Sequence, residues 1–245
     1  MASIDVTFDF TTDTPGFWDG FWERNNGLGY CGNDPDSCSP TMRRYHRLLW
    51  SKKLPNGERM VLVEGCGREY LVWRDFVFAS DSITTGFRYG RCKDLIDDVA
   101  ASMDDYRGWM ESIIRRTYTI GGEIIFSKHR NSINQIRGSN RSVCDRWDLT
   151  LECIRRFYEG EKSPIDWCLE QDRAFFDLFV DFRGYVDFFL LQDCVSKDYT
   201  EVKLWLDTVP FRDDPLPKDV DGYLTWIRNE TEFVDRRNGR IHSIM

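Results

Sequence analysis

Hydrophobic residues recur along the chain with two different spacings, and the spacing changes near its middle. The first half contains short runs, rich in β-branched and aromatic residues, that alternate with polar positions or are apolar throughout, as expected for strands. These runs occupy residues 4–10, 59–64, 70–79 and 123–127. Leu54-Pro55-Asn56-Gly57 has the residue order of a tight turn, so we expect residues near 48–53 and 59–64 to be joined as a hairpin.

Longer stretches repeat apolar residues every three or four positions, which is typical of amphipathic helices. These stretches cover residues 93–117, about 142–158, 164–192, and Val220 to Asn238-Gly239. Ser39-Pro40 provides a capping residue and a proline at the first helical position, which predicts a short helix after it. The stretch 164–192 is apolar on nearly every side, so we expect a central core helix.

These elements predict an α+β fold in a single domain, residues 1–245, with a β-richer N-terminal half and a helical C-terminal half. Residues 1–127 combine strands and helix, and residues 128–245 are mainly helical. The segment 11–40 is rich in Gly, Asn, Asp and Pro and carries Trp18 and Trp22. We expect a long loop there, held by its aromatic residues, with at most one short helical turn.

The chain has 245 residues and a net charge of -8, which argues against a nucleic-acid partner because such binding needs clustered Lys and Arg. Its eight cysteines form no CxxC pair, so we expect reduced thiols. The N-terminus has no signal-peptide pattern, and no stretch is apolar enough to cross a bilayer. These observations favour a cytoplasmic protein that is not bound to a membrane.

The segment between the strand at 123–127 and the following helix contains the best candidate site. Cations, amides and backbone donors at a helix start favour an anion such as a phosphate or a carboxylate. The candidate ligand-binding residues are Lys128, His129, Arg130, Asn134, Gln135, Arg137, Asn140, Asp145 and Arg146. The competing interpretation is a solvated loop whose side chains cap neighbouring backbone. No phosphate-binding glycine motif is present, so the sequence specifies no nucleotide and no cofactor.

The apolar residues around this segment predict that it is ordered. Ile133 and Ile136 lie within it and Trp147 follows it, which provides anchors at short intervals. We therefore expect Asn134 and Arg137 to share a concave surface with Asp145 or Arg146. At least one of Asn134 and Arg137 should be buried and hydrogen-bonded.

Two other sets of residues carry weaker chemical signals. Asp145, Asp148 and Glu152 fall on one helical arc and could hold a divalent cation, but pairing of Glu152 with Arg155 and Arg156 is the more frequent arrangement for such spacing. We assign no metal ligand. Ser80 and Ser82 flank Asp81 without the spacing of a nucleophile elbow.

Three functions compete at this stage, and the residues do not decide whether the protein is an enzyme. The leading hypothesis is binding of a small anionic ligand by the segment 128–146. The alternative is a regulatory or interaction protein whose aromatic residues in 11–40 contact a protein partner. The third is a metal-dependent phosphohydrolase or nuclease that uses the acidic arc.

Several stretches together resemble a family of bacterial proteins of about this length that has no assigned function. The stretches are FDFTTDTPGFWDGFW, LWSKKLPNGE, SDSI, SINQIRG, DRWDLTLECIRR and DFRGYVDFFLLQD, and they extend over nearly the whole chain. The resemblance implies a bacterial, non-secreted protein that is a single unit. It brings no activity, ligand or fold.

Overall fold

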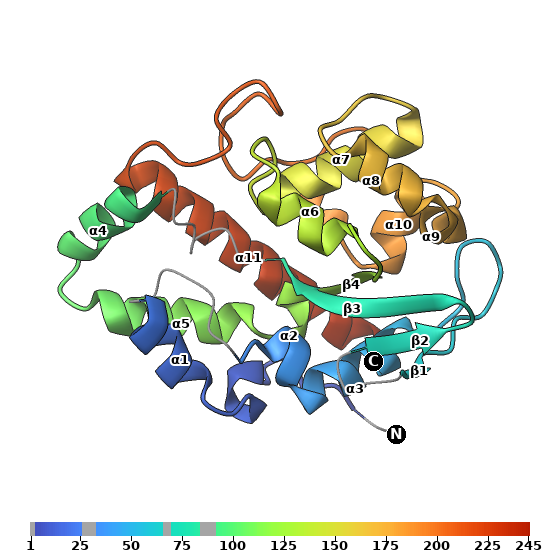
Figure 1. Cartoon of the computed structure of the whole chain (residues 1–245), viewed down its shortest axis with the longest axis horizontal. Coiled ribbons are helices and arrows are strands. Elements are labelled where there is room, and N and C mark those ends of the chain that lie inside the picture. Colours follow the sequence, from blue (N-terminus) through green and yellow to red (C-terminus); the bar gives the residue numbers. More distant parts are fainter. Residues whose placement is uncertain (1–2, 26–32, 66–69, 84–91) are drawn as a thin grey trace.

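The computed structural model describes residues 3–25, 33–65, 70–83 and 92–245. An antiparallel four-stranded sheet lies between two groups of helices (Figure 1). Its strands follow the order β1-β2-β3-β4 and are β1 (Val63–Glu64), β2 (Tyr70–Trp73), β3 (Phe76–Ser82) and β4 (Glu123–Ser127). The fold is therefore α+β with its strands in the N-terminal half, as the sequence predicts.

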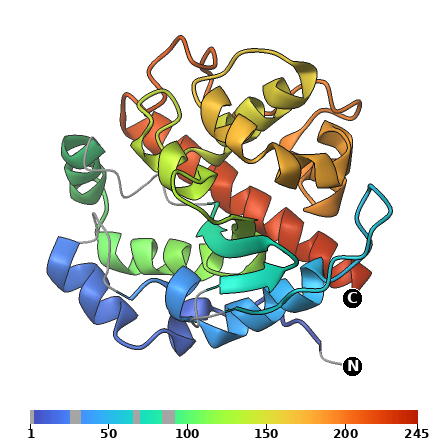
Figure 2. The ribbon, with the colours of Figure 1, turned by 45° about the vertical axis from the view of Figure 1, so that its right-hand side comes forward.

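The two groups of helices cover different sides of the sheet, and the long last helix runs past both groups (Figures 1 and 2). The first group is α1 (Phe17–Asn25), α2 (Pro35–Cys38), α3 (Pro40–Trp50), α4 (Lys93–Ala101) and α5 (Tyr106–Thr117). The second is α6 (Ile133–Ser139), α7 (Trp147–Glu159), α8 (Asp166–Gln171), α9 (Arg173–Phe176) and α10 (Phe182–Phe188). The last helix is α11 (Val220–Ile244). One cluster of buried apolar residues extends from Ile4 to Ile241.

Turns alter two of the predicted strands. Residues 4–10 form no strand, because Asp5 accepts hydrogen bonds from the backbone and hydroxyl of Thr7 and turns the chain. Residues 70–79 form a hairpin, since Arg74 adopts a left-handed conformation (φ 53°) that reverses the chain between β2 and β3. The turn at residues 54–57 is present, with Gly57 at φ 91°.

Local capping divides the predicted long helices although their apolar pattern continues. The stretch 93–117 breaks into α4 and α5, because the Asp105 carboxylate accepts from the Gly108 amide and starts a new helix. The stretch 164–192 breaks into shorter helices, and the positive φ angles of Val180 and Leu190 mark two of its breaks. The last helix continues past Asn238-Gly239, where the Asn238 side chain accepts from the Gly121 amide.

The segment 11–40 contains more helix than the sequence predicts, although residues 26–32 lie outside the described residues. Phe17 and Phe21 of α1 are buried in the core. Trp18 and Trp22 are half-buried, and the guanidinium groups of Arg115 and Arg107 lie over their respective rings. They therefore do not form the exposed flat patch that motivated a protein-partner function.

Two further observations concern the cysteine thiols and whether any helix could span a membrane. Cys153, Cys168 and Cys194 are free and buried, and burial raises the pKa of the first two thiols to about 12. These thiols are therefore poor nucleophiles. Cys31 and Cys66 lie outside the described residues. No helix in the described parts of the chain combines the length and apolarity needed to cross a membrane.

Candidate functional site

The segment 128–146, which we call the basic segment, is ordered and partly helical. The sequence predicts a loop for residues 128–141, whereas Ile133–Ser139 forms α6. Ile133 is buried and anchors this helix beside β4. After α6, Cys144 and Asp145 adopt positive φ angles of 50° and 60°, so that α7 begins at Trp147 and not near residue 142.

Arg137 is fully buried, and acceptors surround its guanidinium. Its Nη1 donates to Asp81 Oδ2 at 2.7 Å and to the carbonyl of Ser82 at 3.1 Å. Its Nη2 donates to the carbonyl of Asp145 at 2.7 Å, and its Nε lies 3.1 Å from Oδ1 of the same residue. The prediction that Asn134 or Arg137 is buried and hydrogen-bonded is thus confirmed for Arg137, which joins α6 to β3.

Arg146 is also fully buried. It pairs through Nε and Nη2 with both oxygens of Asp148, and its Nη1 donates to the carbonyl of Pro215 at 2.6 Å. Asp148 also accepts from the Trp205 amide at 2.8 Å. Arg146 therefore fastens the 205–215 segment to the start of α7 and has no exposed donor for a ligand.

The acidic arc on α7 is occupied by arginine side chains of the protein itself. Glu152 pairs with Arg155 at 2.8 Å and with Arg156 at 2.7 Å, as the sequence suggests. Asp145 and Asp148 pair with Arg137 and Arg146. In the described parts of the chain, no three His, Cys, Asp or Glu side chains are arranged to hold a metal ion.

Three other candidates of the basic segment make hydrogen bonds within the protein, and a fourth is exposed to solvent. His129 contacts Asp172 through Nε2 at 2.8 Å, Gln135 accepts from the Asn131 amide at 3.1 Å, and Asn140 donates to the Pro164 carbonyl at 3.3 Å. Arg130 is exposed. The structure therefore does not gather these four side chains around one point.

Lys128 and Asn134, by contrast, line a cavity of about 180 Å³ between α2, β3 and α6. We call it the Lys128 cavity. Its lining residues are Asp34, Asp36, Ser37, Tyr70, Ala79, Ser80, Asp81, Lys128 and Asn134. The described ladder between β2 and β3 ends at the pair Tyr70–Ala79, so the cavity borders the part of β3 that extends beyond this pair.

The donor atoms of the two candidates on the cavity wall have no acceptor among the described residues. Lys128 is half-buried, and its ammonium group makes no hydrogen bond or ion pair with that part of the chain. Asn134 accepts from the Ser132 hydroxyl at 2.6 Å through Oδ1, which leaves its Nδ2 available. Both groups can therefore donate to a molecule in the cavity.

Carboxyl groups from three elements lie on or beside the same cavity. Asp36 belongs to α2, Asp81 to β3, and Glu123 begins β4 and is fully buried. The carboxyl groups of Asp36 and Glu123 are hydrogen-bonded to each other, which requires a shared proton. Apart from this proton, Oδ1 of Asp36 and both oxygens of Glu123 receive no hydrogen bond from the described residues.

The surroundings of these groups raise their affinity for protons. Burial first, and then the neighbouring acidic groups, raise the pKa values of Asp36 and Glu123 well above the usual range. Burial also raises the pKa of Asp81 to about 7. Arg137 opposes this increase, but it is shared between Asp81 and Asp145 and so neutralises only one carboxylate.

Ser80 and His46 form a pair beside the cavity that resembles a nucleophile and its base. His46 Nε2 lies 2.9 Å from Ser80 Oγ. However, the Trp50 indole donates to His46 Nδ1 at 3.0 Å, so the single proton of the neutral imidazole is on Nε2 and points at the serine. Burial lowers the pKa of His46 to about 3. His46 therefore donates to Ser80 and cannot remove its proton, which excludes this pair as a serine-nucleophile dyad.

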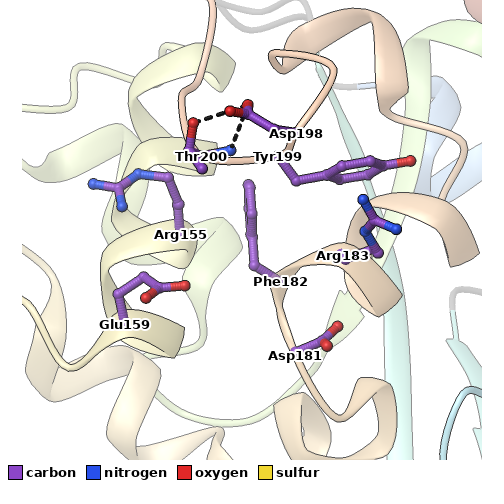
Figure 3. A pocket seen from close by; sticks show the side chains of 8 residues that line it. All are labelled: Arg155, Glu159, Asp181, Phe182, Arg183, Asp198, Tyr199 and Thr200. Carbon is purple, nitrogen blue, oxygen red and sulfur yellow. Dashed lines mark hydrogen bonds between the residues drawn. The ribbon is translucent and has the colours of Figure 1, made fainter.

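A second cavity, of about 290 Å³, lies between α7, α10 and the 198–200 segment (Figure 3). Phe182 projects into the middle of it, and Thr200 donates to Asp198. The Arg183 guanidinium lies 4.3 Å from the centre of the Tyr199 ring, and Arg155 pairs with Glu152 and Glu161. Its polar groups are exposed or partnered, so it is the weaker candidate.

The carboxyl groups of the Lys128 cavity were not among the candidates derived from the sequence. Asp36 and Glu123 are remote in the sequence, and only the packing of α2 against β3 brings them together. One signal was available: Glu123 is the only charged residue in the buried strand EIIFS, and a charged group is rarely buried without a special environment.

Comparison with known proteins supports the resemblance noted in the sequence. No curated protein and no solved structure matches the chain. The model of a family of unknown function, DUF6994, matches residues 4–241, which is nearly the whole chain. The chain therefore belongs to this family of unknown function.

Proposed function

We propose that the protein binds a small ligand in the Lys128 cavity and that Lys128 and Asn134 contact an anionic group of the ligand. One observation carries this proposal: both side chains line a cavity while their donor atoms lack acceptors among the described residues. Lys128 is half-buried, and its ammonium group receives no charge-assisted hydrogen bond from the described residues. A bound carboxylate or phosphate would supply the missing charge-assisted hydrogen bonds.

This proposal narrows the anion site expected from the sequence to the start of the basic segment. Arg137 and Arg146 already contact carboxylates and carbonyls of the protein, so a ligand would have to displace these buried partners. Lys128 requires no such exchange. A lysine ammonium is also compact and can approach an anion from several directions.

The size of the cavity limits the ligand. A volume of about 180 Å³ corresponds to about six water molecules at their liquid volume of ~30 Å³ each. This space suits a metabolite of a few heavy atoms and excludes complete burial of a dinucleotide.

We also propose the bacterial cytoplasm as the setting. What supports it is the resemblance described above together with the buried thiols of Cys153, Cys168 and Cys194. Free thiols are maintained in reducing compartments, where small charged metabolites are abundant.

The test is a thermal-shift screen of carboxylate- and phosphate-bearing metabolites, followed by calorimetry of each compound that stabilises the protein. A ligand at about 100 times its Kd adds about 2.7 kcal/mol of stability, which raises the Tm by about 5–10 °C for a chain of this size. Lys128→Met should abolish the shift.

Arg130→Met is the matched control, because Arg130 is a nearby cation that is exposed and does not line the cavity. This variant should retain the shift. Absence of stabilisation by every compound, or retention of the shift in Lys128→Met, would contradict the proposed function.

A further inference from the structure

The cationic and the acidic side chains of the Lys128 cavity come from different positions along the sheet. The Lys128 amide donates to the Val77 carbonyl at 2.7 Å, and Asp81 lies opposite Ile124 in the ladder between β3 and β4. Four residues of β3 therefore separate the two positions, about 13 Å between backbones at ~3.3 Å per residue. Lys128 and Asp81 thus reach the cavity from different positions along the strands.

The acidic part of the cavity contains carboxyl oxygens that lack a donor, just as the Lys128 part contains donors that lack an acceptor. Apart from the proton that the two carboxyl groups share, Oδ1 of Asp36 and both oxygens of Glu123 are buried without a donor from the described residues. Glu123 is completely inaccessible to solvent and does not line the cavity. Its carboxyl group contacts that of Asp36, which does line the cavity. Buried acceptors of this kind are normally satisfied, so their occurrence beside a cavity points to a donor supplied from outside.

We propose that the ligand is a small zwitterion, with a carboxylate on Lys128 and Asn134 and a primary ammonium group on Asp36 and Asp81. This inference rests on the proposed function, since it assigns the second charge of the same ligand. An ammonium group has three donors and no acceptor, which matches the carboxyl groups of Asp36 and Asp81 on the cavity wall, where Oδ1 of Asp36 lacks a donor from another group. A ligand with a carboxylate alone would leave this oxygen unsatisfied.

The proton shared by Asp36 and Glu123 is exchanged when the ligand binds. In the unliganded protein this proton satisfies the two carboxyl groups. The ammonium group brings its own N–H donors and a positive charge, so the shared proton leaves to solvent and the charge of the pair changes from one negative to two. Affinity for a zwitterion should therefore increase with pH in the range where its amine remains protonated.

Several charged groups determine the pH at which this exchange occurs. The acidic groups that face the pair disfavour its ionisation, whereas nearby cations favour it. The groups from the surrounding elements are Asp34 before α2, Asp81 of β3, Lys128 after β4, Arg137 of α6, Asp145 before α7 and Arg237 of α11. His46 of α3 is neutral, as its hydrogen bonds show, and contributes no charge.

The experiment compares matched probes on the intact protein by calorimetry. 5-Aminovalerate and the common amino acids carry both charges, valerate carries only the carboxylate, and pentylamine carries only the ammonium group. We expect the best zwitterion to bind at least about tenfold tighter than either singly charged probe, because hydrogen bonds between charged groups are strong. Titrations in buffers of different ionisation enthalpy should show release of a proton with the zwitterion and none with valerate.

Asp36→Asn should remove the preference for the zwitterion over valerate and the release of a proton, while the carboxylate remains bound through Lys128. Glu123→Gln provides a second variant with the same expected direction. Asp94→Asn, which changes an exposed aspartate on α4, should behave as the wild type.

The outcomes separate this inference from the proposed function. Equal affinity for valerate and every zwitterion, or an unchanged preference in both Asp36→Asn and Glu123→Gln, would overturn the zwitterion while leaving the anion site intact. Binding of pentylamine but of no carboxylate would overturn both. Absence of binding by all probes would overturn the zwitterion, and together with a negative thermal-shift screen it would overturn the proposed function as well.

Discussion

Lys128 and Asn134 at the start of the basic segment present donors to a cavity, whereas Arg137 and Arg146 near its end are buried among acceptors. All four side chains carry N–H donors, and they are separated by short distances in sequence. The difference lies in their partners. A buried arginine with its donors satisfied stabilises the fold, while a half-buried lysine without an acceptor can stabilise a ligand.

The largest effect should come from removing one of the buried, ion-paired arginines. Arg137→Met leaves the carboxylates of Asp81 and Asp145 without their cation, so we expect a loss of about 3–5 kcal/mol in the free energy of unfolding. Chemical denaturation of the purified variant measures this loss. Arg130→Met, the exposed control, should change stability by no more than about 0.5 kcal/mol. Equal stability of the two variants would show that the Arg137 contacts do not hold the fold.

An intermediate effect should appear when pH is changed. The pKa of Asp81 is raised to about 7 in the folded protein and is about 3.9 in an unfolded chain. The folded state therefore binds a proton more tightly, and this contribution is present below about pH 4 and is lost as pH rises through about 7. We expect it to fall by at most about 4 kcal/mol, as judged from the difference between the two pKa values.

Glu123→Gln sharpens this prediction because it fixes a neutral side chain at a position where the pKa is raised well above its usual range. The wild type should lose stability relative to this variant as pH rises through the folded pKa of Glu123. Urea denaturation from pH 4 to 9 makes the comparison. A difference that stays constant with pH would show that Glu123 does not carry a proton in the folded protein.

The smallest effect should come from Lys128→Met. The Lys128 ammonium group has no partner among the described residues, so its removal should change the free energy of unfolding by no more than about 0.5 kcal/mol. Thermal denaturation without ligand tests this expectation. Destabilisation comparable to that of Arg137→Met would show that Lys128 serves the fold and would remove the contrast between the two ends of the segment.

The sequence predicts those elements whose signals are local. Ser39 caps α3 by accepting from the Met42 amide, and Pro40 begins this helix as expected. The breaks within 93–117 and 164–192 were not predictable from apolar spacing, because the core still needs apolar residues on both sides of a break. They depend on caps such as Asp105 and on positive φ angles such as that of Val180.

The candidate site could be predicted only in part. Lys128 and Asn134 belong to one short segment, so its composition indicated them. Which cations are already paired depends on residues distant in sequence, as the contact of Arg137 with Asp81 shows. Asp36 and Glu123 share a proton only because α2 packs at the sheet, and one sequence contains no signal for such a pair.

The most direct test of the contrast between the two ends is a crystal structure of the protein grown with 5-aminovalerate. We predict electron density for the compound in the Lys128 cavity, with its carboxylate within hydrogen-bond distance of Lys128 Nζ and Asn134 Nδ2, and with Arg137 and Arg146 unchanged. A cavity that holds only water, or density for the compound at Arg137, Arg146 or elsewhere on the protein, would contradict the assignment of the ligand site to Lys128 and Asn134.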